Sequence, residues 1–199
     1  MSQPAAAASG TRPGLVFASG LGRWVLLATV LGSAIASIDA TVVGIALPAI
    51  GRNFHTGVTS VQWVVDAYTL TLAGLLLLGG TLGDSYGRRK VFAIGVVWFA
   101  LASLLCGVAP SAGVLIAARA LQGVGGALLT PGSLAILQAS FAQDDRAAAI
   151  GAWSGLGGLA TAIGPFLGGY LIGAVSWRLG HGHGPIDHLG WGDRDGLPR

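Results

Sequence analysis

The amino-acid sequence predicts an all-α polytopic membrane protein, a bundle of about five transmembrane helices. Two observations lead to this fold class. Hydrophobic residues make up 53% of the 199 residues and charged residues only 10%, whereas a soluble domain has roughly a quarter charged residues. In addition, five apolar runs are each long enough to cross a hydrocarbon layer, which takes roughly 20 helical residues. We therefore expect the lipid bilayer to be the solvent of most of the chain.

We place the spanning helices at 24–50, 61–82, 91–109, 113–137 and 147–174. The first run starts directly after Arg23 and is too long for the core of a cleaved signal peptide. The second contains one acid, the third is bounded by bases and Pro110, and the fourth and fifth are rich in Gly and Ala. Residues 23–175 thus form the predicted transmembrane part. Residues 1–22, rich in Ala, Gly and Pro, are expected to be a disordered cytoplasmic tail.

The bases in the short loops predict the orientation of the helices. Cytoplasmic loops carry an excess of Lys and Arg. Arg52 lies in the link between the first two runs, and the link between the third and fourth runs around Pro110 has no charge. The alternate links and the N-terminal flank hold the other bases near the membrane, which are Arg12, Arg23, Arg88, Arg89, Lys90 and Arg146. The sequence therefore predicts a cytoplasmic N-terminus in a multi-pass protein of the cell membrane.

The link between the second and third runs, "GGTLGDSYGRRKVF", concentrates charge in an otherwise apolar region. Its residues Gly83 and Gly87 permit tight backbone geometry. Its bases would hold the turn on the cytoplasmic side. A simple topology anchor explains the bases, but it does not explain Asp84 or the spacing of the glycines.

Four stretches together resemble the major facilitator superfamily, in its fourteen-helix drug:proton antiporter branch (the EmrB/QacA type). The turn pattern Gly80-x-Leu82-Gly83-Asp84-x-x-Gly87-Arg88-Arg89 is similar to the superfamily's loop signature. "SIDATVVGIALPAI" at 37–50, "LIAARALQGVGGA" at 115–127 and "GLATAIGPFLGG" at 158–169 resemble the signatures of helices 1, 4 and 5. The likeness runs from about residue 20 to Arg178. It implies that the chain is a partial N-terminal helix bundle of such a transporter.

The resemblance also implies a function and partners. It implies proton-coupled efflux of hydrophobic or cationic small molecules, antibiotics among them, with protons as the coupling ion and without a cofactor. It further implies that activity needs the C-terminal half of the transporter. Residues 176–199 are rich in Gly, His and Asp and depart from the family, so we expect a disordered tail from a truncated or frameshifted gene. The alternative is a non-transporting membrane protein or subunit.

Three charges fall inside the predicted spans: Asp39, Asp66 and Arg119. Charged groups at membrane depth are costly and are functional candidates by default. Counting about 1.5 Å per helical residue puts all three at a similar depth in the outer half of the membrane. We expect Asp39 to be the proton-coupling acid, with Asp66 second and Arg119 as the counter-charge. The alternatives are a fixed Asp39–Arg119 ion pair and a merely interfacial Asp66.

The fourth and fifth runs carry two further patterns. A polar or small stripe at helical spacing predicts the wall of a cavity, or else a helix-packing face, and consists of Arg119, Gln122, Gly126, Thr130 and Ser133. In the fifth run, rows of small residues predict a packing and gating surface. This surface includes Gly164, Pro165, Gly168 and Gly169.

Other classes of function find little support. The bases form no cluster that would bind nucleic acid. The four metal-capable side chains near the C-terminus, His181, His183, Asp187 and His188, lie in a Gly-rich segment and do not predict a metal site. We find no nucleophile or zinc motif of an enzyme, and Cys106 is interpreted as a small buried hydrophobic residue.

Overall fold

The computed structural model describes the backbone of residues 14–174 and the side chains of residues 14–166. Five helices follow one another, with bounds α1 Gly20–Phe54, α2 Val58–Tyr86, α3 Arg88–Gly107, α4 Ala112–Ser140 and α5 Gln143–Ala174. Each is long and apolar enough to cross a membrane. The five predicted spans are therefore confirmed. Every helix begins before its predicted apolar run, whereas α3 ends at Gly107, before its run ends.

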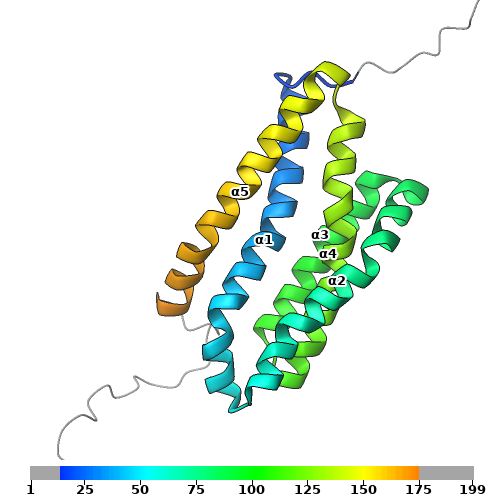
Figure 1. Cartoon of the computed structure of the whole chain (residues 1–199). Helices are drawn as coiled ribbons and strands as arrows, with labels where there is room; N and C mark the ends of the chain where they lie inside the picture. Colours follow the sequence, from blue (N-terminus) through cyan, green and yellow to red (C-terminus); the bar gives the residue numbers. More distant parts are fainter. Residues whose placement is uncertain (1–13, 175–199) are drawn as a thin grey trace, which may run out of the picture.

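Successive helices run in opposite directions, so the links alternate between the two ends of the bundle (Figure 1). The start of α1, the α2–α3 link and the α4–α5 link lie at one end, and the α1–α2 and α3–α4 links lie at the other. Local chemistry sets the boundaries. Ser19 caps α1 by accepting a hydrogen bond from the Gly22 amide, and Ser111 caps α4 in the same way at Val114. His55 ends α1 in the left-handed conformation.

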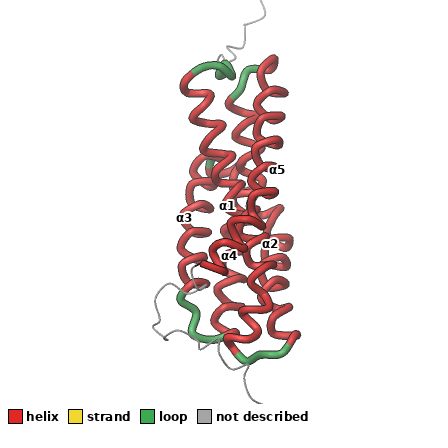
Figure 2. Tube along the Cα trace, turned by 90° about the vertical axis from the view of Figure 1, so that its left-hand side faces the viewer, coloured by secondary structure: helices red, strands yellow, loops and turns green. Residues whose placement is uncertain are grey.

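The bundle consists of two groups of helices. α4 packs most extensively against α2 and α3, while α1 packs mainly against α5 (Figures 1 and 2). Glycines on α4 allow the close approach. A side chain at Gly123 would collide with α2, and one at Gly125 would come within 2.8 Å of the Phe99 backbone on α3. Small residues of this kind let transmembrane helices pack closely.

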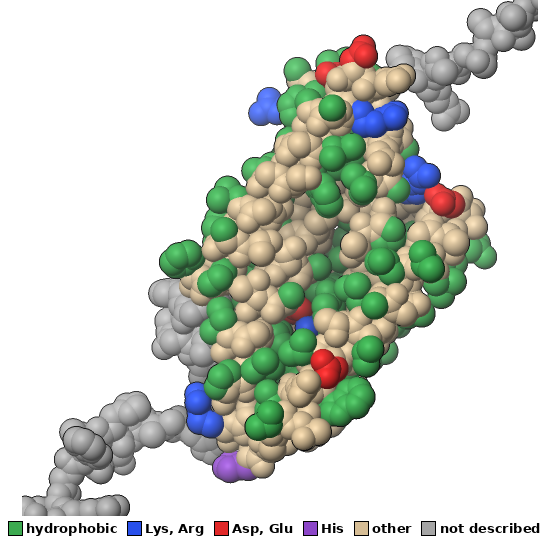
Figure 3. All heavy atoms as spheres, viewed as in Figure 1, with side chains coloured by type: hydrophobic (Ala, Val, Ile, Leu, Met, Phe, Trp, Pro, Cys, Tyr) green, Lys and Arg blue, Asp and Glu red, His purple; other side chains and the backbone are tan. Residues whose placement is uncertain are grey.

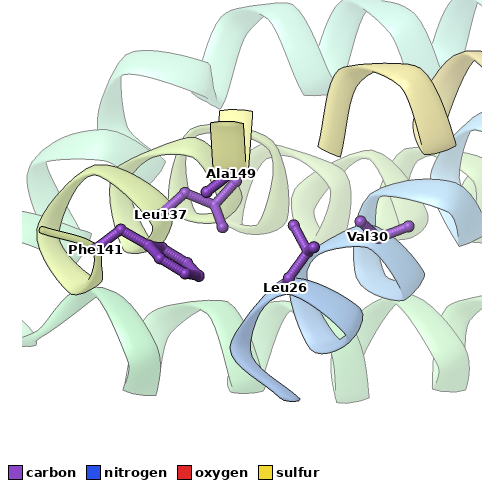
Figure 4. Packing of buried hydrophobic residues seen from close by; sticks show 5 residues of the cluster. All are labelled: Leu26, Val30, Leu137, Phe141 and Ala149. Carbon is purple, nitrogen blue, oxygen red and sulfur yellow. The ribbon is translucent and has the colours of Figure 1, made fainter. Parts of the chain in front are cut away.

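Buried side chains join the two groups at both ends. A cluster of Leu26, Val30, Leu137, Phe141 and Ala149 connects α1, α4 and α5 near the α4–α5 link (Figure 4). At the opposite end, Ala46 and Ile50 of α1 pack with Val64 of α2 and Leu115 of α4. The outer surface is apolar as well, with Leu77 of α2 84% and Phe166 of α5 79% exposed. A surface of this kind suits contact with lipid.

The N-terminal flank corrects one expectation. Disorder was expected through residue 22, but the described part of this segment is ordered from residue 14. Leu15 forms a β-bridge with Phe141, and the Phe17 amide donates to the Asp145 carboxylate at 2.9 Å. The Leu15 amide also donates to the Ser140 carbonyl. We call residues 14–17 the N-terminal strap. Residues 1–13 and the predicted tail at 176–199 lie outside the described residues.

Candidate functional site: a buried ion pair between two helix groups

An ion pair inside the bundle joins α4 to α1. Nη1 of Arg119 lies 2.6 Å from Oδ2 of Asp39. The Arg119 side chain is 2% exposed and the Asp39 side chain 19%. Most other charged side chains lie near the two ends of the molecule, as the blue and red atoms of Figure 3 show. Two of the three predicted intramembrane charges are therefore in direct contact.

Arg119 is held by α2 as well. Its Nε donates to the Val64 carbonyl at 3.2 Å, and its guanidinium carbon lies 4.3 Å from the centre of the Tyr68 ring. A guanidinium over an aromatic face is attracted by the ring's quadrupole, more strongly where water is excluded. Neither partner carries a charge, so sequence reasoning about charged residues could not find them. Their combined effect is to fix the position of the Arg119 side chain from a second helix.

Gln122, one turn after Arg119, completes the arrangement. Its side chain is fully buried. Its Oε1 accepts from Nη1 of Arg119, and its Nε2 donates to Oδ1 of Asp39 at 2.8 Å. On α3, Oγ of Ser103 accepts from the same Nε2 at 2.7 Å, and Sγ of Cys106 donates to Oε1 at 3.5 Å. Four helices therefore contribute to one polar network.

Sequence reasoning missed Ser103 and misread Cys106, which is half-buried and hydrogen-bonded. One signal was available, because the two residues are three positions apart on α3 and therefore share a helix face. That signal is weak on a helix without an intramembrane charge.

Asp66 does not join this network. Its side chain is half-buried, and within residues 14–166 its carboxylate makes no ion pair or hydrogen bond with another residue. A similar depth in the membrane therefore brought only Asp39 and Arg119 together. The interfacial alternative for Asp66 stays a prediction.

The predicted polar stripe of α4 divides into two parts. Arg119 and Gln122 belong to the network. Further along, a side chain at Gly126 would meet Leu72 and Tyr68 of α2, and Ser133 is fully buried, whereas Thr130 is exposed. The Gly126 and Ser133 positions thus pack against neighbours. A cavity-lining role for the stripe remains a prediction.

The charged turn lies at the end of the bundle that holds the N-terminal strap. Gly87 alone links α2 to α3, with φ at +99°, a conformation that favours glycine. Asp84 pairs with Arg88 at 3.0 Å, and Arg88 also donates to the Ala135 carbonyl of α4 at 3.2 Å. Arg89 donates to the Ser140 hydroxyl at 3.3 Å. The turn is therefore tied to α4 by two arginines.

A cavity of about 180 Å³ adjoins this turn, between α2 and α4. Gly80, Asp84 and Arg88 contribute to its wall from the turn, and Pro131 and Ala135 contribute from α4. The predicted loop residues thus surround a partly enclosed space.

The α5 residues are less uniform than expected. Gly164 is buried against α1, where an added side chain would lie 3.0 Å from Cβ of Thr41. Pro165 is exposed. The surroundings of Gly168 and Gly169 lie outside the described side chains. Only Gly164 is therefore seen in a helix contact, and gating by this surface stays a prediction.

Comparison with known proteins identifies the family. The profile of the Major Facilitator Superfamily matches residues 29–181. The chain belongs to this superfamily. It is thus a multi-pass membrane protein of a family of transporters rather than of enzymes.

Curated relatives are resistance and export proteins. The chain is 44% identical over 156 residues to the puromycin resistance protein of Streptomyces alboniger, covering 78% of this chain and 31% of that protein. It is 42% identical over 164 residues to the tetracenomycin C resistance and export protein of Streptomyces glaucescens, covering 81% and 30%. Identity to the methylenomycin A resistance protein of Bacillus subtilis is 41% over 162 residues, covering 80% and 34%. The chain spans about a third of the length of these relatives.

Proposed function

We propose that these helices belong to a proton-driven drug exporter of the cell membrane, in which Asp39 takes up and releases the coupling proton. The observation that carries the proposal is the partly buried contact of Asp39 with Arg119 and Gln122. The names of the relatives support antibiotics as substrates. The distribution of bases supports a cytoplasmic N-terminus.

The chemistry of the pair suits an exchange between a proton and a counter-charge. A carboxylate at membrane depth must be neutralised, either by a nearby cation or by a proton. In the described conformation Arg119 does this for Asp39 across 2.6 Å. If Arg119 moves away, a proton is the remaining means of neutralising the carboxylate. The pair can therefore convert a change of distance into the binding or release of a proton.

The position of the pair supports such a change of distance. Asp39 lies on α1, which packs mainly against α5, and Arg119 lies on α4, which packs mainly against α2 and α3. A shift of one helix group against the other would change this distance. In transporters of this kind, alternating access comes from movement of a whole bundle against a second one. The second bundle would come from the C-terminal half, against which the Asp84 turn would close.

The proposal is tested in inside-out vesicles that contain a full-length version with both halves. An imposed proton gradient should drive uptake of a fluorescent cationic drug. Asp39→Asn should abolish this uptake and still allow the drug to bind, because Asn keeps the size of the side chain but cannot exchange a proton. Asp66→Asn, the same substitution outside the network, should be much less harmful. Normal uptake by Asp39→Asn would show that the pair is structural.

The alternative of a non-transporting protein is tested separately. Cells that produce only the 199-residue chain are compared with cells that produce the full-length version, and drug accumulation is measured in both. We expect the short chain alone to leave accumulation unchanged. Lower accumulation with the short chain would show that export does not need the other half.

A further inference from the structure

We propose that Ser103 and Cys106 of α3 are positioning residues, which hold the Gln122 amide in the one orientation that bridges Asp39 and Arg119. The effect of this positioning on transport rests on the proposed function, whereas the positioning itself does not. The contacts themselves involve one amide group and four partners on three helices. No role in transport follows from the type of either α3 residue alone.

Every hydrogen-bond donor and acceptor position of the Gln122 amide has a partner. A primary amide has two N–H donors and an oxygen that accepts two bonds. The Nε2 donors go to Asp39 and Ser103, and Oε1 accepts from Arg119 and Cys106. A reversed amide would place its oxygen against the Asp39 carboxylate and its N–H₂ group against the Arg119 guanidinium. Both contacts would then be repulsive.

Ser103 is suited to accept rather than donate at this position. Its hydroxyl already donates to the Phe99 carbonyl of its own helix at 2.8 Å. The hydroxyl oxygen therefore presents lone pairs to Nε2 of Gln122, which lies 2.7 Å away. Cys106 presents the opposite polarity, because its thiol donates to Oε1. The two α3 residues thus select one orientation of the amide, independently of the ion pair.

This independence matters when Asp39 takes up a proton. Protonation removes the negative charge that attracts both Arg119 and the amide N–H₂ group. The contacts of Ser103 and Cys106 involve no charge, so they persist through that change. The α3 residues would therefore keep Gln122 ready to receive Arg119 when the proton leaves. In the proposed transport cycle this would speed the return to the ion-paired state.

Cys106 provides a direct measurement, because it is the single cysteine of the chain. The S–H stretching band in the infrared moves to higher frequency when the thiol loses its acceptor. In the purified, membrane-reconstituted chain, Cys106→Ala should remove the band and so assign it. Gln122→Leu should raise the frequency by removing the acceptor. Ser103→Ala should also raise the S–H frequency, because it releases the Gln122 amide. Ser103→Thr keeps the hydroxyl, so this variant should show the wild-type frequency.

Ser37→Ala is the matched control. Ser37 lies two residues from Asp39 and donates to a carbonyl of its own helix, as Ser103 does, but among the described residues it makes no hydrogen bond with Gln122. In the Ser37→Ala variant, the S–H band of Cys106 should have the same frequency as in the wild type. The proposal is overturned if Ser103→Ala leaves the band in place in a folded chain, or if Ser103→Thr moves it as far as Ser103→Ala does. Normal export by Asp39→Asn together with these band shifts would contradict the transport role of Asp39 and leave the positioning role of the two α3 residues in place.

Discussion

Gly79 of α2 faces the backbone carbonyl of Ala127 of α4 so closely that even a methyl group would collide with it. We therefore expect Gly79→Ala to separate the two helices and to lower the free energy of unfolding by about 2 kcal/mol, as overpacking does in other cores. Thermal unfolding in detergent, followed by circular dichroism, measures the change.

Gly74→Ala is the matched control on the same helix. No atom lies within 4 Å of the position that its added Cβ would occupy. The change from Gly to Ala in a helix should then stabilise the protein, by up to about 1 kcal/mol. If Gly79→Ala and Gly74→Ala changed the free energy of unfolding equally, α2 and α4 would not be in close contact at Gly79.

Asp84 should matter for export more than for stability. Its ion pair with Arg88 is exposed, and such pairs contribute about 1 kcal/mol or less. In the full-length version, Asp84→Asn should nevertheless impair export more than Arg89→Lys, because Asp84 is the one acid of the turn and Lys keeps the positive charge. Export rates and unfolding midpoints are measured for both variants. Normal export by Asp84→Asn would reduce the turn to a topology anchor.

The orientation in the membrane can be tested at two exposed positions. Ser85→Cys lies at the charged turn and His55→Cys at the opposite end of the bundle. In a Cys106→Ala background, a membrane-impermeant maleimide added to intact cells should label position 55 only. Labelling at position 85 should require permeabilised cells. Equal labelling of the two positions in intact cells would mean that α2 does not cross the membrane.

The N-terminal strap should depend on Asp145. Its carboxylate accepts from the Phe17 amide, and a hydrogen bond of this kind contributes about 1 kcal/mol net. Asp145→Ala removes the acceptor and should therefore accelerate hydrogen exchange of the Phe17 amide by about fivefold. Asp144→Ala changes the neighbouring, exposed acid and should leave the exchange rate unchanged. Similar acceleration in both variants would indicate a general charge effect.

Much of the fold could be predicted from the sequence, because a helix that crosses lipid requires a long apolar run, and such runs are visible in the sequence. The contact between Asp39 and Arg119 was also predictable, since two opposite charges at the same depth have a strong reason to meet. Asp66 shows the limit of that argument. Helix length gives the depth of a residue, but not the direction in which its side chain points around the helix axis.

The other misses have physical causes of the same kind. Residues 14–17 resemble a tail in composition, yet their backbone groups find partners in the α4–α5 link. Val64 contributes to the site through its carbonyl, which every residue type possesses. Cys106 is apolar in most buried settings, and only the neighbouring Gln122 oxygen makes its thiol a donor. Single-residue patterns cannot reveal such partners, because they depend on the packing of another helix.

The distance along the chain between Asp39 and Arg119 has a consequence for biosynthesis. The two residues are 80 positions apart, so Asp39 leaves the ribosome well before its partner exists. At roughly 5–20 residues per second, translation of the intervening segment takes on the order of ten seconds. During this interval the nascent α1 carries an acid without a counter-charge. An unpaired charge is costly in lipid, so α1 gains its neutralising contact only after α4 has been made.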